Sequence, residues 1–389
     1  MEQLILVAMA LVLMVIGGLL IAGGRGLARM ESGLPLDNPD PWPGVALLVP
    51  VAGAAPDLAA NLISLLSQDY PDYQVIFITK EMADPATPVI AALIPEYPRS
   101  RLILSGPARS CGQKNHNLLA GLKALGEGAE ILVFCDSTRL APANWLKSMV
   151  LPLVRGEVPV VSGYHHVFPQ DQGLATWGRA ITVLILYLTK PIPRLNQPWG
   201  GATAIKRQVF EDLQVAGLWS RNVVDDVSLA ALLQEKGLKV GLAAGASLHT
   251  PLQGETLASW SDWLTRQWLY LKFCLPGSWL AVGFSFYLLA ALVLLSGVRL
   301  LAAALGFSLG PAWPGAVFLA GLTGLAAALK TIHPQPVRLR TWLPAFYGAM
   351  GMAVWCHLRT WRTREIHWRG ISYRVGWQGR VVGIKQRKT

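Results

Sequence analysis

A single carboxylate follows one of the most apolar short runs of the chain. Asp136 comes directly after residues 131–135, Ile-Leu-Val-Phe-Cys, which have the length and composition of a buried strand. An ionised Asp there is unfavourable unless it is hydrogen-bonded, paired or bound to a cation. Its oxygens could hold a divalent cation that bridges a diphosphate. Capping of the next helix is the alternative, and the residue alone leaves both open.

Two further acidic positions occur elsewhere in the chain. Glu81 and Asp84 follow the apolar run at 75–78, where a carboxylate can accept hydrogen bonds from a nucleoside base or ribose. Asp225 and Asp226 begin a segment that we expect to be helical. Adjacent carboxylates at the amino end of a helix leave one free to act as a general base in a cleft, although both could simply cap the helix.

Short apolar runs and amphipathic segments alternate around these positions. We expect strands at 45–49, 75–78, 102–104, 131–135, 158–162 and 201–205, and helices at 58–66, 89–94, 115–125, 143–150 and 225–236. Such alternation predicts a mostly parallel α/β sheet with right-handed crossovers. Ligands of such sheets collect at the carboxyl ends of the strands, so the acidic positions can converge on one edge.

The composition indicates a membrane protein. Of the 389 residues, 52% are hydrophobic and only 15% are charged, with a mean hydropathy of +0.39, which is too apolar for an ordinary soluble domain. Residues 4–22, 277–297 and 312–329 are long and apolar enough to span a bilayer. The shorter run 343–357 is expected to be re-entrant or interfacial. The segment 174–188 could lie in the membrane interface or pack in a core.

The basic residues suggest an orientation and a partner. Arg25 and Arg29 follow the first apolar run, which predicts an uncleaved anchor with its carboxyl end in the cytosol. The formal charge of +11 is compatible with either nucleic acid or an anionic membrane surface. Arginines cluster around the last apolar segments, which favours acidic lipid headgroups and argues against nucleic acid: Arg338, Arg340, Arg359, Arg362, Arg364, Arg369, Arg374 and Arg380.

These observations divide the chain into five parts. We expect an N-terminal transmembrane anchor at 1–24, a Pro-rich linker at 25–44, a cytosolic catalytic domain at 45–275, membrane segments at 276–358 and a basic tail at 359–389. The cysteines, Cys111, Cys135, Cys274 and Cys356, are far apart. Their spacing predicts neither a zinc site nor a disulfide framework.

The order of short motifs resembles a family 2-type inverting glycosyltransferase, and more narrowly the ceramide glucosyltransferase group. The first set of motifs comprises Val49-Pro-Val51, Ser67-Gln-Asp-Tyr-Pro71, Phe134-Cys-Asp-Ser137, Gly200-Gly-Ala-Thr-Ala-Ile205 and Val224-Asp-Asp-Val227. The three acidic motifs of that group match Asp84-Pro85-Ala86, Cys135-Asp136-Ser137 and Asp225-Asp226. The Lys-x-x-Asn segment of the group matches Gly112-Gln-Lys-Asn-His-Asn117. Its terminal signature resembles Glu365-Ile-His-Trp-Arg369 together with Tyr373-Arg374. The resemblance runs from about 45 to 374 and implies the α/β GT-A fold, a Rossmann-like mixed sheet.

The resemblance also implies roles for single residues. Asp226 would be the base that deprotonates the acceptor hydroxyl, and Asp136 would bind Mg²⁺ or Mn²⁺ at the diphosphate of the donor. The nucleotide-sugar would be bound by Glu81, Asp84, Lys114, Asn117, Asp136, Asp225 and Arg266. Lys114 would meet phosphate or sugar hydroxyls as a point charge, although a solvated surface lysine is the simpler alternative.

One motif departs from the group's pattern. The group has Arg/Gln-x-x-Arg-Trp after the base, whereas this chain has Leu264-Thr-Arg-Gln-Trp268. Trp268, expected at the acceptor site, keeps its place, but Arg266 stands one position early, which is about 100° of rotation on a helix. We therefore expect either that Arg266 reaches round to the leaving diphosphate or that another cation replaces it.

The histidines are weaker candidates. His249 could complete the metal shell after a strand, whereas His165 and His166 are more typical of loop or core residues because no second ligand cluster accompanies them.

The sequence thus predicts an integral membrane enzyme that transfers a hexose from a nucleotide-sugar, with UDP-glucose favoured, to the hydroxyl of a ceramide- or diacylglycerol-like lipid. A processive polysaccharide synthase is one alternative, but it should keep the intact Gln-x-x-Arg-Trp motif and more spans. A catalytically inactive membrane scaffold is the other, and the altered Leu-Thr-Arg-Gln-Trp motif is its support.

Overall fold

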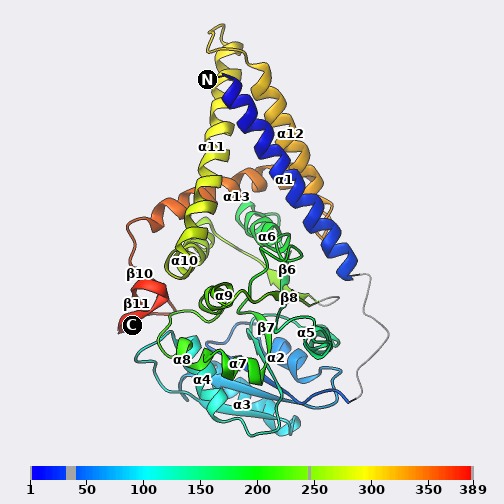
Figure 1. Ribbon diagram of the computed structural model, residues 1–389, viewed down its shortest axis with the longest axis vertical. Helices are drawn as coiled ribbons and strands as arrows, with labels where there is room; N and C mark the ends of the chain where they lie inside the picture. The colour runs from blue at the N-terminus through cyan, green and yellow to red at the C-terminus, as the bar shows by residue number, and fades with distance from the viewer. Residues whose placement is uncertain (1, 32–40, 244–246, 387–389) are drawn as a thin grey trace.

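The computed structural model describes residues 2–31, 41–243 and 247–386. Three long helices project together from a globular α/β domain, and a small β-sheet near the C-terminus lies against the side of that domain (Figure 1). Of the predicted Pro-rich linker, 25–44, residues 25–31 continue the first helix, Glu2–Glu31, and residues 32–40 lie outside the described residues.

A seven-stranded sheet forms the centre of the domain, in the order β3-β2-β1-β4-β7-β5-β8. Neighbouring strands are parallel except at β7, which is antiparallel to both β4 and β5. The bounds are β1 Val45–Pro50, β2 Tyr73–Thr79, β3 Ser100–Leu104, β4 Ile131–Cys135, β5 Val160–Ser162, β7 Ala202–Lys206 and β8 Val240–Leu242. The mixed, mostly parallel sheet confirms the predicted fold class, and the predicted strands agree to within a few residues.

Helices cover both faces of this sheet because its strands are apolar on both sides. In β1, Val45, Leu47 and Val49 join one buried cluster, whereas Ala46 and Leu48 join the other, as the two-residue period of a strand requires. One face is covered by α2 Leu58–Leu66, α3 Ala86–Leu93, followed by η1 Ile94–Glu96, and α5 Trp145–Val154. The other is covered by α4 Gln113–Lys123, α7 Arg207–Asp212, α8 Val215–Trp219 and α9 Asp226–Glu235.

Three helices are long and apolar enough to cross a membrane: α1 Glu2–Glu31, α11 Pro276–Ala304 and α12 Trp313–Lys330. They pack side by side, and α13 Leu339–Thr360 runs across their base (Figure 1). Among the described helices α13 is not a candidate span, in agreement with an interfacial position for 343–357. The helices α6 Leu174–Tyr187 and α10 Leu257–Cys274 pack beneath it, and α6 buries Trp177, Ile181 and Leu184 in that contact, so its core interpretation holds.

The C-terminal segment predicted as a basic tail, 359–389, contains three strands that the sequence analysis did not predict. These residues form an antiparallel sheet of β10 Glu365–Trp368, β11 Ile371–Val375 and β12 Val381–Gln386, with η2 Trp377–Gly379 before the last strand. Ile366, Tyr373 and Val375 lie on the apolar face of this sheet and pack on α10 and the segment before α9. The arginines between them obscured this short alternating pattern. A parallel pair, β6 His165–Pro169 and β9 Leu248–Leu252, completes the domain.

Candidate active site

The carboxyl ends of the parallel strands bring the predicted acidic residues to one edge of the sheet. Asp84 follows β2, and its Oδ1 accepts hydrogen bonds from the backbone N–H groups of Gly53 at 2.8 Å and Ala86 at 2.9 Å. Asp84 therefore joins the loop after β1 to the loop after β2. Glu81 is exposed and pairs with Lys80 at 3.0 Å. Of the two residues predicted to contact the nucleoside, Asp84 is the one whose side chain is fixed by hydrogen bonds to the backbone.

Lys114 lies at the centre of the site and is not a solvated surface lysine. Its Nζ is 2.9 Å from Asp136 Oδ1 and 2.9 Å from Asp225 Oδ2, and it donates a hydrogen bond to the carbonyl of Gly200 at 2.8 Å. Burial alone would lower the pKa of Lys114, but Asp136, Asp225 and Asp226 outweigh that effect and raise it. Lys114 therefore stays charged and holds the carboxylates together. Helix capping does not explain Asp225, whose side chain makes no capping hydrogen bond.

Asp226 is held with its carboxylate toward the same cluster. Its Oδ2 accepts a hydrogen bond from the N–H of Gly200 at 2.8 Å, and its Oδ1 accepts one from Val227 at 2.7 Å. Burial, together with repulsion from Asp225, raises the pKa of Asp226 to about 6, although Lys114 opposes the shift. A carboxylate with such a pKa is ionised at neutral pH and is a stronger base than an ordinary Asp.

The donor set near Asp136 fits a cation that arrives with a diphosphate. Mg²⁺ and similar ions are often held by one or two carboxylates plus phosphate oxygens, and Asp136 provides one partly exposed carboxylate. Over the described ranges, no group of three or more His, Cys, Asp or Glu side chains could hold a metal by itself. His249 is the second residue of β9, and its ring lies 4.9 Å from Phe168. Its role as a metal ligand stays a prediction.

Asn117 lies behind the site. Its Nδ2 donates to the carbonyl of Ile78 at 3.2 Å, and its Oδ1 accepts hydrogen bonds from Ser105 Oγ and Gln113 Nε2, both at 2.8 Å. With 3% of its surface exposed, Asn117 joins α4 to the ends of β2 and β3. This geometry favours a positioning role for Asn117 over a direct contact with the donor.

Arg266 and Trp268 both lie on α10. Burial raises the pKa of Tyr270, with Arg266 opposing the shift and Asp226 adding to it, so Arg266 and the acidic cluster both lie near this phenol. The Trp268 ring is 5.9 Å from Phe286 and 5.2 Å from His357, on the membrane-helix side. Trp268 thus faces α11 and α13.

A group of aromatic and basic residues next to Asp226 was not predicted from the sequence. Trp199, which directly precedes Gly200, stacks on His165 with ring centroids 4.7 Å apart, and Arg139 lies 5.0 Å over the Trp199 ring. Lys190 lies 5.2 Å from the Tyr164 ring, and burial lowers its pKa to about 7. The only signal in the sequence is Pro198-Trp199-Gly200-Gly201, a turn with a large aromatic residue. His165 is a buried residue of this group, as its core interpretation predicts.

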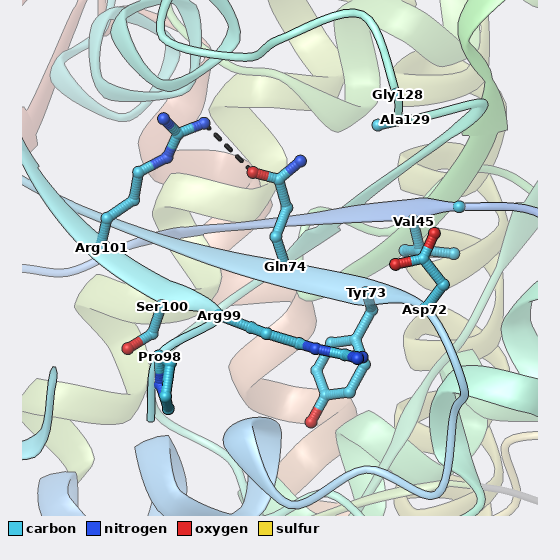
Figure 2. A pocket seen from close by; sticks show the side chains of 11 residues that line it. Val45, Asp72, Tyr73, Gln74, Pro98, Arg99, Ser100, Arg101, Gly128 and Ala129 are labelled. Atoms are coloured by element: carbon cyan, nitrogen blue, oxygen red, sulfur yellow. Dashed lines mark hydrogen bonds between the residues drawn. The ribbon is translucent and has the colours of Figure 1, made fainter. Parts of the chain in front are cut away.

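A cavity of about 430 Å³ lies at the opposite edge of the sheet (Figure 2). It is lined by Val45, Tyr73 and Ser100, the first residues of β1, β2 and β3. Arg101 donates a hydrogen bond to Gln74 Oε1 at 3.1 Å beside it. Since ligands of parallel sheets bind at the carboxyl ends of the strands, this cavity is separate from the candidate site.

Comparison with known protein families shows to which family the chain belongs. A family model described as glycosyl transferase family 21 matches residues 5–381. The chain belongs to glycosyl transferase family 21. The resemblance seen in the motifs is therefore confirmed.

The curated relatives of this family 21 protein are distant. Ceramide glucosyltransferase 1 of Caenorhabditis elegans is 21% identical over 250 residues, which cover 60% of this chain and 51% of that protein. Ceramide glucosyltransferase of Candida albicans is 29% identical over 131 residues, 30% of this chain and 24% of that protein. The matched region thus spans about half the length of the first relative and a quarter of the second.

One solved structure shares the overall fold. The mannosyltransferase PcManGT from Pyrobaculum calidifontis, in complex with GDP-Man and Mn²⁺, superposes with a TM-score of 0.54 at 18% identity. The match covers 91% of this chain and 99% of the other. This likeness confirms the GT-A fold of the family 21 protein.

Proposed function

We propose that this family 21 protein transfers a hexose from a nucleotide-sugar to the hydroxyl group of a membrane lipid, with inversion at the anomeric carbon. One observation carries the proposal: Asp226 is held beside Lys114, Asp136 and Asp225 at the carboxyl edge of the sheet, with a pKa raised to about 6. The ceramide glucosyltransferase relatives support a lipid acceptor and favour UDP-glucose as the donor.

The residues divide the reaction between them. Asp226 accepts the proton of the acceptor hydroxyl as that oxygen bonds to the anomeric carbon and the bond from that carbon to the diphosphate oxygen breaks. Attack from the face opposite the diphosphate inverts the configuration. Lys114 fixes Asp136 and Asp225, and Asp84 orients the nucleoside. A Mg²⁺ or Mn²⁺ ion held by Asp136 would offset the charge of the departing diphosphate, and the Mn²⁺ bound with GDP-Man in PcManGT supports this use of a divalent cation.

The helices supply the route to a lipid. We propose that α1, α11 and α12 span the membrane, that 45–275 forms the cytosolic catalytic domain, and that α13 lies at the interface. Trp268, and Trp199 with the ring of His165 stacked on it, lie between the catalytic edge and these helices. This position supports an acceptor that enters from the bilayer side.

Release of nucleotide tests the proposal. Purified full-length protein is incubated with UDP-glucose and other nucleotide-sugars, with and without a lipid extract, and free nucleoside diphosphate is measured. We expect lipid-dependent release that Asp226→Ala abolishes, whereas Glu235→Ala, an exposed carboxylate at the end of the same helix, leaves it unchanged. Absence of turnover with every donor and lipid would favour an inactive scaffold, and lipid-independent polymer would favour a polysaccharide synthase.

A further inference from the structure

The turn between β10 and β11 has an unusual residue at its tip. Arg369 and Gly370 both have positive φ angles, 46° and 74°, as in the two-residue type I′ turn of a tight hairpin. Asn, Asp or Gly normally occupies the first of these positions because the left-handed region is unfavourable for a long side chain. An arginine at such an unfavourable position indicates that its side chain has a role beyond forming the turn.

The Arg369 side chain reaches the loop after β1. Its Nη1 donates a hydrogen bond to the carbonyl of Ala52, a residue 317 positions away in the sequence. A Cβ atom on Gly53 would lie only 2.8 Å from the same nitrogen. Because the N–H of Gly53 is bonded to Asp84, the guanidinium of Arg369 lies next to the nucleoside end of the site.

Both acidic and basic residues lie near the guanidinium group of Arg369. Burial lowers the pKa of Arg369, Asp84 and Asp136 oppose that shift, and Arg266 adds to it. The contacts with Ala52 and Gly53 place Arg369 at the Asp84 end of the proposed donor site. A guanidinium group held at this end of the proposed donor site can pair with the phosphate oxygens of a bound nucleotide.

Lys114 does not provide this pairing by itself. Its ammonium group is already paired with Asp136 and Asp225, at 2.9 Å each. A divalent cation held by Asp136 would offset part of the charge of a bound diphosphate, and a planar guanidinium group, which matches phosphate oxygens well, can pair with the rest.

We propose that Arg369 binds the diphosphate of the nucleotide-sugar and supplies the cation that the altered Leu-Thr-Arg-Gln-Trp motif lacks. This inference rests on the proposed function. The site is then built from two distant parts of the chain, the carboxyl edge of the central sheet and the hairpin of the terminal sheet.

The terminal sheet is fixed in a position that suits this role. The N–H of Gln113, at the start of α4, donates to Tyr373 Oη at 3.1 Å. The N–H of Val223 donates to the carbonyl of Gly379 at 3.0 Å, and that of Val381 to Arg221 at 2.8 Å. The sheet is thus bonded to the segment before Lys114 and to the segment before Asp225, which makes the hairpin tip a defined wall of the donor site.

Binding of nucleotides and nucleosides tests the assignment. The dissociation constants of UDP and GDP, and of uridine and guanosine, are measured by calorimetry on the full-length protein in detergent with Mn²⁺ present. For the diphosphate that the unmodified protein prefers, we expect Arg369→Ala to weaken binding by about tenfold or more, since a hydrogen bond to a charged group is lost. Binding of the matching nucleoside should change by less than about twofold, because the nucleoside carries no phosphate with which the guanidinium could pair.

Two further variants separate charge from structure. Arg369→Lys keeps a point charge without the fork geometry and should recover part of the diphosphate affinity. Arg374→Ala removes an exposed arginine of the same hairpin and should change neither constant. Unchanged diphosphate affinity in Arg369→Ala, or equal losses for diphosphate and nucleoside, would overturn the inference alone. Failure of the unmodified protein to bind either diphosphate would overturn the proposed function as well.

Discussion

Lys114 and its acidic neighbours act as one unit rather than as separate residues. The lysine joins Asp136, at the end of β4, to Asp225, at the start of α9, and through Gly200 it also adjoins Asp226. The charge of each residue therefore depends on the others, and a change at one position alters both catalysis and stability.

The pH dependence of turnover follows from the proposed role of Asp226 as the base. Because its pKa is raised to about 6, the carboxylate is protonated below that pH and cannot accept the proton of the acceptor. We expect kcat/KM to fall as the pH is lowered through about 6, in a pH titration of the purified enzyme. The raised pKa also affects stability. Because the ordinary pKa of an Asp is 3.8 and that of Asp226 in the fold is about 6, the folded state holds this proton more tightly than the unfolded state. The free energy of unfolding therefore falls as the pH rises from about 3.8 through about 6.

Circular dichroism at each pH serves as the control for the titration, since unfolding would lower activity for another reason. A flat profile of kcat/KM between about pH 5 and pH 8, with the fold intact, would rule out Asp226 as the base with a pKa near 6.

Removal of Lys114 should destabilise the domain. Lys114→Ala leaves Asp225, whose side chain is 5% exposed, without its cation, and removal of one partner of a buried ion pair costs about 3 kcal/mol. We expect that loss in the free energy of unfolding, measured by denaturant titration in detergent. Lys123→Ala, at the exposed end of the same helix, should change it little. Equal effects of the two variants would show that the ion pairs contribute nothing to stability.

At this scale the sequence predicted the acidic residues better than the basic ones. Asp84, Asp136 and Asp226 follow strands or open a helix, and the topology of parallel sheets brings such positions together. Arg369 belongs to a hairpin whose distance from Ala52 in the sequence gives no local signal. The partners of Lys114 were likewise unpredictable, because they depend on the packing of α4 against a turn 86 residues away.

At the scale of elements, α6 and α10 join the α/β domain to the long apolar helices. The apolar pattern of α6 could not distinguish core from membrane interface, because both environments favour the same side chains. In the structure α6 packs in a core, because Trp177 of α6 and Trp260 of α10 are both almost fully buried. Gly178 allows the contact, since the ring of Trp260 lies where a side chain at 178 would be.

A methyl group at position 178 should disturb that contact. The added Cβ of Gly178→Ala would lie 2.6 Å from Cζ3 of Trp260, which is 1% exposed and cannot move aside freely. We expect a loss of about 1–3 kcal/mol in the free energy of unfolding, typical of overpacking. Gly217→Ala, in the short helix α8 with open space around its Cβ position, should be neutral or slightly stabilising. A neutral Gly178→Ala would show that α6 and α10 adjust independently.

At the scale of the whole molecule, the three apolar helices and the terminal sheet define the position of the catalytic edge. Glu2 lies close to Gly310, in the loop between α11 and α12, so the N-terminal helix begins at the far end of the helical bundle (Figure 1). The chain then enters the domain, leaves through α11 and returns through α12. This path places α13 and the terminal sheet on the same side as the domain.

The proposed orientation can be tested by cysteine labelling, since all four native cysteines are buried and should react slowly. Ser308→Cys, in the exposed loop between α11 and α12, should react with a membrane-impermeant maleimide in intact cells. Glu127→Cys, on the exposed surface of the domain, should react only after the membrane is permeabilised. The reverse pattern would place the catalytic edge outside the cytosol, away from its nucleotide-sugar. Protection of both sites in intact cells would mean that α11 and α12 do not cross the bilayer.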